Sequence, residues 1–498
     1  MGDDYFHTLF CPLNEKKGWM RMKAPFSNYL NSLAEPMKNL VKILRKDYDY
    51  VSILSTDSVG LQISVSPRNK SVSNDNLTTE RGNVVRVYKN GLYAEYAFNS
   101  FDPAGMKDLA EKIRAELDAQ LEVLAATRTK PYFTKKLADE PLTLFVEKEA
   151  GILPEKADVN YYINLFGELT AEGMKLAPHA VQCSVTAQST HISKMFLTAN
   201  RDLRQSYVYS EANMLLVAAN EENSRFGYDG ISGCKGLEVF EELRPLPKKL
   251  AETAEKMLKA KRLVPGEYDI ITDPGVTGLI AHEAFGHGVE MDMFVKNRAL
   301  GKEYINKRVG SDLVTMHEGA KCAESVTAFA FDDEGTLACD VIEIDHGILK
   351  TGIADALSAL RLGIAPTGNG KRQNFEHKVY TRMTNTLFDS GENTLEEMIA
   401  SVEYGYLLEG VESGMEDPKH WGIQCLVSRA YEIKDGKLTG EMYSPVVMTG
   451  YVPDLLGSVS MASKDCGVEG NGFCGKGYKE FVKVADGGPY LKARARLG

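Results

Sequence analysis

Residues 279–290 read LIAHEAFGHGVE and place His282, Glu283 and His287 within six residues of one another. Two imidazoles and a carboxylate suit a divalent transition metal together with a proton acceptor for an activated water. The zinc-protease helix familiar from many sequences spaces its histidines at i and i+4, so that both lie on one face. In this stretch the histidines are instead at i and i+5.

A regular helix could not aim both histidines at one ion, because about 3.6 residues per turn would separate them by about 140°. A π-bulge, or a helix that ends early, would bring the two rings together, and such bulges often occur at functional sites. Gly286 and Gly288 make either distortion easy. The spacing alone is equally compatible with an amphipathic helix that carries two ordinary histidines.

The bulk composition restricts the class of protein. A chain of 498 residues is too long for one core, so two or more domains are expected. Its formal charge of −11 argues against general affinity for nucleic acid or an anionic membrane. The eight cysteines are scattered without a CxxC pair, the N-terminus lacks a secretory signal, and no apolar run could span a membrane. We therefore expect a cytoplasmic protein with neither a nucleic-acid nor a membrane partner.

The fold class predicted from the pattern of elements is α+β. Residues 1–35 are expected to form an irregular N-terminal extension, and residues 36–262 an α+β domain with an antiparallel sheet and long helices. The turn-forming residues Val264-Pro265-Gly266 mark the boundary of the second domain, residues 263–498. Beyond residue 320 that domain reads as short strands, so it is predicted to be mostly β and to carry the metal-site helix.

Turn and capping residues locate several elements. The expected features are strands at 50–54 and 61–65, a hairpin at Asn90-Gly91, a helix begun by Asp102-Pro103 and a helix over 156–176. They continue with strands at 181–188, 191–198 and 328–331, a glycine loop over 227–236, a helix begun by Asp273-Pro274 and a hairpin at Asp435-Gly436.

Two histidines leave a metal short of ligands, because catalytic zinc usually takes three protein ligands and keeps one position for water. The third ligand could be a carboxylate, such as the nearby Glu290, or a thiolate. Cys474 lies in the stretch GNGFCGKG (470–477), where the adjacent lysine favours a thiolate. A small buried residue in a turn is the alternative. The same stretch fits G-x-x-x-x-G-K, but Gly477 replaces the magnesium-binding Ser or Thr, so we reject nucleotide binding.

These residues resemble the TldD/PmbA metallopeptidases, a family also known as modulators of DNA gyrase. Residues 275–290 resemble its HExxxH signature, and residues 474–476 (CGK) resemble the C-terminal block that supplies a cysteine ligand. Residues 332–336 (DDEGT) and 382–386 (RMTNT) resemble two further blocks, in the expected order. The resemblance covers the second domain well and residues 36–262 loosely.

The resemblance implies a zinc site of His282, His287 and Cys474, with Glu283 as general base. It also implies a peptidase acting on unfolded or extended peptides, working as a homodimer or as a heterodimer with a paralogue that lacks the motif. Arg382 and Asn385 are candidates to bind the substrate main chain, with a structural role as the alternative.

Two other functions are compatible with the sequence. One is a non-catalytic, metal-bound modulator of a partner protein. The other is a metal-dependent amidase or deformylase acting on small substrates, because two histidines and a cysteine also suit that chemistry. The remaining histidines of the second domain are expected to be surface or packing residues: His317, His346, His377 and His420.

Overall fold

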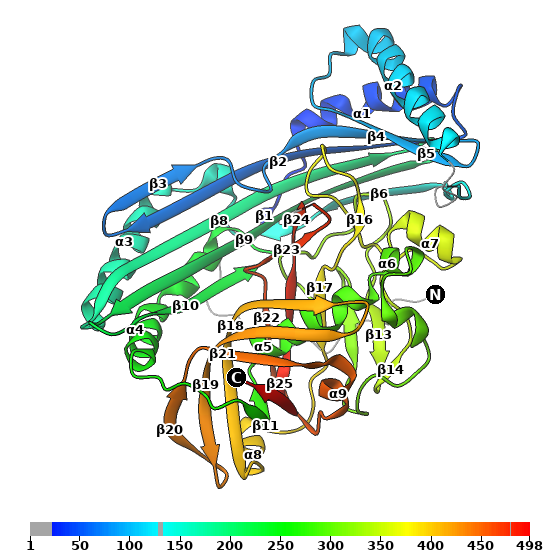
Figure 1. Ribbon diagram of the computed structural model, residues 1–498. Coiled ribbons are helices and arrows are strands. Elements are labelled where there is room, and N and C mark those ends of the chain that lie inside the picture. Colours follow the sequence, from blue (N-terminus) through cyan, green and yellow to red (C-terminus); the bar gives the residue numbers. More distant parts are fainter. Residues whose placement is uncertain (1–21, 128–132, 479) are drawn as a thin grey trace, which may run out of the picture.

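The computed structural model describes residues 22–127, 133–478 and 480–498. A large antiparallel sheet from the first half of the chain crosses the whole molecule, and the second half lies beneath it (Figure 1). The predicted α+β class is confirmed.

The N-terminal sheet has the strand order β10-β9-β8-β2-β4-β5, with β3 paired to β2 and β6 paired to β9. Its strands are β2 (Tyr50–Ser66), β3 (Asn69–Ser73), β4 (Arg81–Lys89), β5 (Leu92–Phe98), β6 (Leu142–Glu147), β8 (Ala180–Leu197), β9 (Arg201–Ala219) and β10 (Ser224–Gly233). A small ribbon pairs β1 (Met22–Lys23) with β7 (Glu149–Ala150). The helices are α1 (Asn28–Leu44), α2 (Met106–Ala126), α3 (Val159–Leu176) and α4 (Leu246–Met257), with short turns η1 (Pro103–Gly105), η3 (Pro154–Lys156) and η4 (Leu237–Leu243).

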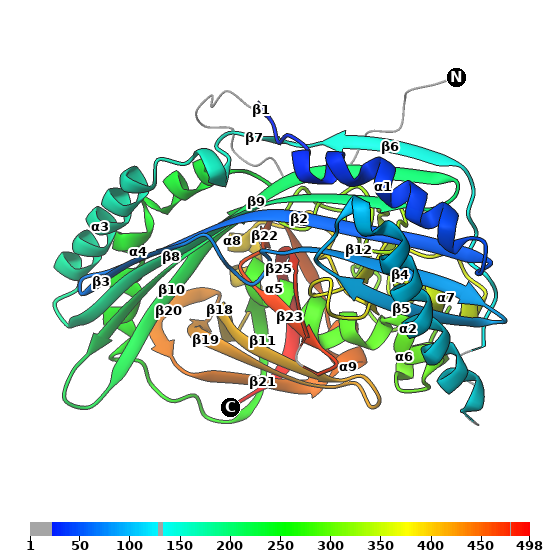
Figure 2. The same ribbon diagram turned by 90° about the horizontal axis from the view of Figure 1, so that it is seen from above.

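The two faces of this sheet are buried against different partners, as the alternation along β9 shows. Met214 and Leu216 share a core cluster with Phe166 of α3. Gln205, on the opposite face, donates to the Phe331 carbonyl of the second half at 2.8 Å. The helices therefore cover one face and the second half of the chain covers the other (Figures 1 and 2).

The strands of this sheet are longer than expected. The predicted strands 50–54 and 61–65 are two ends of the single strand β2. The polar residues between them broke the hydrophobic pattern, yet they are buried and satisfied: Ser55 donates to Asn83 at 2.7 Å, and Asp57 pairs with Arg81. The runs 181–188 and 191–198 join in the same way within β8.

The expected glycine loop over 227–236 is wrong for most of its length, because residues 224–233 form the strand β10. A Cβ at Gly227 would lie 2.8 Å from the Leu250 carbonyl oxygen of α4, and one at Gly230 would lie 2.6 Å from Asn471 Nδ2. These glycines mark close approaches of neighbouring segments to a strand, which is a second common use of glycine.

The expected irregular extension over 1–35 is wrong for residues 22–35; residues 1–21 lie outside the described residues. Helix α1 begins at Asn28, capped by the Ser27 hydroxyl. Pro36 lies inside this helix, where proline normally breaks helical structure, and it obscured the pattern. Burial of residues such as Leu30 and Met37 against the sheet stabilises the helix despite the proline.

Five strands of the second half close into a ring. β11 pairs in parallel with β18 and antiparallel with β25, and the circuit β18-β19-β21-β25 completes it. The strands are β11 (Gly266–Thr272), β12 (Met316–Glu318), β13 (Val341–Asp345), β14 (Ile348–Leu349), β15 (Gly370–Lys371), β16 (Tyr380–Thr381), β17 (Asn385–Phe388), β18 (Tyr404–Asp417), β19 (Gly422–Lys434), β20 (Lys437–Tyr443), β21 (Val446–Tyr451), β22 (Met461–Glu469), β23 (Phe473–Lys476), β24 (Glu480–Lys483) and β25 (Ala485–Leu497).

The helical segments of this half are short. They are α5 (Pro274–Leu279), η5 (Ile280–Phe285), η6 (Gly286–Val289), α6 (Met291–Val295), η7 (Leu300–Glu303), α7 (Ala356–Leu362), α8 (Leu395–Ala400) and α9 (Val452–Gly457). Val276, Leu279 and Phe285 share a core cluster with Val427 and Leu491 of the ring. The segment that carries the HExxxH stretch is thus packed against the core of the second half.

Both predicted hairpins are confirmed. Asn90 and Gly91 have φ of 53° and 86°, and Asp435 and Gly436 have φ of 48° and 71°, as two-residue hairpin turns require. The strand expected at 328–331 does not form. Within the described ranges, no helix is both long and apolar enough to cross a membrane.

Candidate metal centre

The HExxxH stretch follows a well-capped helix. Asp273 accepts a hydrogen bond from the Val276 amide at 2.7 Å and starts α5, as predicted. The helix then continues as the π-helix η5 over 280–285 and tightens into the 3₁₀ turn η6 over 286–289. The distortion expected from the i, i+5 spacing is confirmed.

This distortion turns the two histidines toward each other. The ring centroids of His282 and His287 are 5.2 Å apart, with the ring planes at 88°. Cys474 Sγ lies 3.4 Å from His287 Nε2, across 187 residues of sequence. Each of the three residues offers one ligand atom, and these atoms all lie within 4.8 Å of one another. The structure therefore brings the three predicted ligands together.

The geometry fits a zinc ion. Zn–N and Zn–S bonds of about 2.1 and 2.3 Å in a tetrahedral site separate N from S by about 3.6 Å, close to the 3.4 Å between His287 and Cys474. Buried His282 Nδ1 has no hydrogen-bond partner within the described part of the chain, and it lies 3.8 Å from Asp486 Oδ2. Two imidazoles and a thiolate are a donor set that zinc accepts readily.

The electrostatics favour a thiolate at Cys474. Burial alone would raise the pKa of this thiol, but His287 and His282 outweigh burial and hold the pKa well below its usual value. Burial likewise opposes the charge on His282, and the neighbouring thiolate overcomes it and raises the pKa to about 9. The surroundings of Cys474 thus favour the anionic sulfur that a metal ion binds.

Glu290 contacts the His287 ring on the side opposite Cys474. Its Oε2 lies 3.0 Å from His287 Nδ1, the ring nitrogen that faces away from Cys474. Burial opposes its charge, but Lys476 and His287 overcome burial and lower the pKa of Glu290 to about 2. This carboxylate, a candidate third ligand by sequence, instead orients the ring of a candidate ligand, His287. In the sequence, the position of Glu290 three residues after His287 was the one indication that its carboxylate could contact that histidine.

Glu283 lies at the entrance to the centre. Its side chain is 23% exposed, and Oε2 lies 3.8 Å from His287 Nε2. Gly414 of β18 packs against it, because a Cβ at that glycine would lie 2.7 Å from Glu283 Cγ. The glycine therefore leaves room for the carboxylate beside the ligand atoms, and nothing in the local sequence around Gly414 indicated this role.

Arg382 and Asn385 are engaged inside the protein. Arg382 is buried and donates to the carbonyl oxygens of Cys474 and Glu480, so that it supports the backbone of the cysteine strand. Asn385 donates to the Gly319 carbonyl at 3.0 Å. The structural alternative applies to both residues in this structure.

His317, His346, His377 and His420 lie beside carboxylates, as do His179 and His191 of the first half, in arrangements typical of structural histidines. The pairs are His179–Glu255, His191–Glu155, His317–Asp340, His346–Asp345, His377–Glu480 and His420–Asp417.

The DDEGT block lies where the two halves of the chain meet. Glu334 forms a buried ion pair with Arg86 of β4, and Asp333 forms one with Lys194 of β8. These acidic residues contact the N-terminal sheet, so they join the second half to it.

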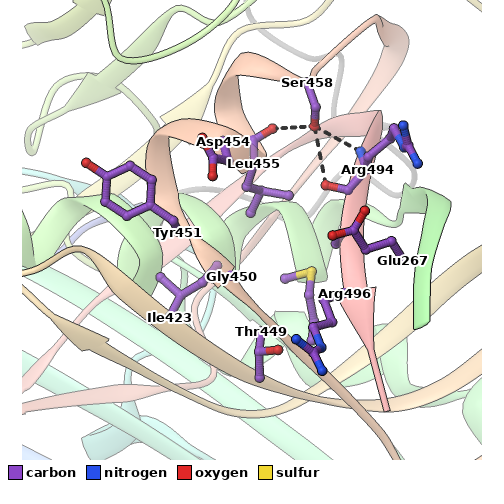
Figure 3. Close-up of a pocket in the computed structure, with 12 residues that line it drawn as sticks. Glu267, Ile423, Thr449, Gly450, Tyr451, Asp454, Leu455, Ser458, Arg494 and Arg496 are labelled. Atoms are coloured by element: carbon purple, nitrogen blue, oxygen red, sulfur yellow. Dashed lines mark hydrogen bonds between the residues drawn. The ribbon is translucent and has the colours of Figure 1, made fainter. Parts of the chain in front are cut away.

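A surface cleft of ≈ 300 Å³ lies beside β21 and β25 (Figure 3). Ser458 borders it, with its hydroxyl donating to the Leu455 carbonyl and accepting from the Arg494 amide (Figure 3). The cleft shares no lining residue with the metal centre, so we assign it no part in the chemistry.

Comparison with known proteins finds similarity to metalloproteases. Residues 265–494 match the PmbA/TldA metallopeptidase C-terminal domain. A metalloprotease from Methanothermobacter thermautotrophicus is 29% identical over 280 residues, which are 56% of this chain and 61% of the relative. A zinc metalloprotease TldD homolog from Saccharolobus solfataricus is 31% identical over 238 residues, 48% of this chain and 52% of the relative. The matched stretches thus cover less than two thirds of either relative.

The fold is shared more widely than the sequence. The solved structure of TldE from Thermococcus kodakarensis has a TM-score of 0.70 at 18% identity, over 93% of this chain and 100% of that one. Residues 265–494 are therefore similar to the C-terminal domain of the PmbA/TldD metallopeptidases, and the fold and the relatives agree with that similarity.

Proposed function

We propose that this protein is a zinc-dependent peptidase of the HExxxH type that hydrolyses unfolded or extended peptides. The observation that carries the proposal is the convergence of His282, His287 and Cys474, with ligand atoms within 4.8 Å, beside the carboxylate of Glu283. The match of residues 265–494 to a metallopeptidase C-terminal domain supports it as well.

In this proposal the chain supplies the ligands and the acid–base group. Zinc, when bound, supplies Lewis acidity that activates water and polarises a scissile carbonyl. Glu283 accepts the proton from the attacking water at its carboxylate and delivers it to the leaving amine. Glu290 holds His287 by its Nδ1, so that Nε2, on the side of Cys474, would hold the zinc ion.

The depth of the site favours an extended substrate. His282 and Cys474 are only 3% and 5% exposed, whereas the side chains of His287 and Glu283 are 17% and 23% exposed. A peptide bond in an unfolded segment can reach these largely buried ligand atoms, and the same bond held in a folded surface cannot. We further propose that the protein acts in the cytoplasm, as a dimer with a second copy or with a paralogue that lacks the motif.

The test is cleavage of an unfolded peptide library by the purified chain and by Glu283→Gln. The variant should keep one zinc per chain and lose cleavage, because it retains the ligands but cannot accept a proton at neutral pH. The Cys474→Ala variant, measured in parallel by elemental analysis, should lose bound zinc.

Three outcomes oppose the proposal. Full cleavage by Glu283→Gln would remove this residue as the base. A native chain that carries zinc but cleaves no peptide would favour the non-catalytic modulator. Turnover of small amides or formylated amino acids, with no turnover of longer peptides, would favour an amidase or deformylase.

A further inference from the structure

Lys476 connects the two parts of the metal centre. Its Nζ lies 2.9 Å from Glu290 Oε2, 2.8 Å from Asp292 Oδ1 and 3.0 Å from the Thr381 carbonyl oxygen. An ammonium has three donors, and all three are satisfied here. The Lys476 side chain is 12% exposed, and those of Glu290 and Asp292 are 2% and 7% exposed. The cluster is therefore a nearly dry ion triad.

The triad sits between two segments that each carry a ligand. Lys476 and Cys474 are two residues apart on β23, so their side chains leave the same face of the strand. Glu290 and Asp292 directly follow the turn that carries His287. The ion triad thus joins the cysteine strand to the histidine turn, which are far apart in sequence.

Glu290 depends on this lysine for its orientation. Its Oε2 is shared between His287 Nδ1 and Lys476 Nζ, while its buried Oε1 has no hydrogen-bond partner among the residues the structure describes. Without the ammonium, only the histidine would hold this carboxylate, and it would face Asp292 with no cation between them. Like charges in a dry site repel strongly, so the position of the Glu290 carboxylate beside His287 would no longer be fixed.

We infer that Lys476 is a positioning residue for the metal centre: through Glu290 and Asp292 it fixes the distance between Cys474 and His287 before metal binds. The inference rests on the zinc site of the proposed function and adds how its shell is preorganised. Removing a carboxylate that orients a metal-bound histidine typically costs about 10- to 100-fold in metal affinity. Lys476 acts through that carboxylate, so Lys476→Met should weaken zinc binding by a factor in this range.

The experiment measures zinc affinity by competition with a chelator in the full-length chain and in Lys476→Met. A second measurement, independent of metal, follows alkylation of Cys474 in the zinc-free protein by peptide mass spectrometry. Cys474 is only 5% exposed, and a loosened strand should raise its alkylation rate. Buried Cys425 and Cys183 serve as internal standards for overall unfolding.

The matched control is Lys296→Met. Lys296 contacts the other oxygen of the same aspartate, Asp292 Oδ2, at 2.9 Å, and it has no contact with Glu290. The Lys296→Met substitution removes one lysine from Asp292 but leaves the contacts of Lys476 with Glu290 intact. Zinc affinity and Cys474 alkylation should match the unmodified chain.

Unchanged zinc affinity and unchanged alkylation in Lys476→Met would overturn the inference. Equal losses in Lys476→Met and Lys296→Met would overturn it as well, since they would indicate a general effect of removing charge. If Lys476→Met fails to fold, Asp292→Asn decides, with weaker zinc binding expected and unchanged binding contradicting the inference. If the unmodified chain binds no zinc, the proposed function fails, and the alkylation arm still tests the positioning role.

Discussion

Single residues in this protein are oriented by carboxylates, both at the metal centre and away from it. Glu290 holds His287 at 3.0 Å, and Asp486 lies 3.8 Å from His282. At a metal site such a carboxylate selects the ring nitrogen that faces the ion. His317, which is not one of the three clustered residues, has a similar arrangement, and there it contributes to stability.

His317 lies between two aspartates, with Nδ1 2.8 Å from Asp340 and Nε2 3.4 Å from Asp389. Hydrogen bonds to both carboxylates raise its pKa to about 10. The folded pKa lies above the unfolded value of about 6.5. The contacts of His317 with the two aspartates therefore stabilise the folded protein fully below about pH 6.5, and this stabilisation is lost as pH rises toward 10. We expect His317→Gln to lower the free energy of unfolding by about 2 kcal/mol at pH 6.

Chemical denaturation at pH 6, 8 and 10 measures this difference, which should shrink steadily as pH rises. His346→Gln is the control, because His346 is 77% exposed beside Asp345 and exposed pairs contribute little. A difference for His317→Gln that is the same at pH 6 and pH 10 would contradict the assignment.

Two short stretches and the family resemblance were sufficient to select His282, His287 and Cys474, which the structure brings together, and Glu283, which lies beside them. The sequence could not show the roles of Gly414 or Lys476. Those roles depend on which strand comes to lie beside the ligand turn, and that is decided by sheet pairing over long sequence separations.

Among the elements, the π-helix was predictable and the strand β10 was not. The i, i+5 spacing of two histidines allows few solutions around one ion, and the chain adopts one of them. The glycines of β10 suggested a loop, because a strand is usually recognised in a sequence by side chains that pack against a neighbouring element. Here the packing partner is the backbone of α4, which needs the side chain to be absent.

Gly227 tests this explanation of β10. In Gly227→Ala the new Cβ would lie 2.8 Å from the Leu250 carbonyl oxygen and 3.3 Å from its Cα, both backbone atoms of α4. The helix must shift away from the sheet, and we expect a loss of about 2 kcal/mol in stability. The measurement is the urea midpoint of the native chain and the variant.

Gly450→Ala is the control for that substitution. Gly450 also lies in a strand, β21, but a Cβ there would meet nothing within 4 Å. Its urea midpoint should equal or slightly exceed that of the native chain. A Gly227→Ala variant as stable as this control would mean that α4 does not need the glycine.

At the scale of the whole molecule, the long strands could not be anticipated because the sheet is buried on both faces. Polar residues in its middle, such as Gln205 and Lys194, interrupt the hydrophobic alternation that identifies a strand. Both are paired with groups from the second half of the chain. Each half therefore supplies polar groups that pair with buried polar groups of the other half, and the stability of each half should depend on the other.

Lys194→Met should reveal this dependence. Its ammonium pairs with Asp333, and the two side chains are 15% and 4% exposed. Removing one partner of a buried pair leaves an uncompensated charge and costs about 3 kcal/mol. Calorimetry should show a lower transition temperature, with the two halves beginning to unfold separately.

Lys148→Met is the matched control, because Lys148 also links the halves, through Glu324, whose side chain is 59% exposed. The control should unfold like the native chain, and an equal effect of both variants would show that burial of the Lys194 pair is not what couples the halves.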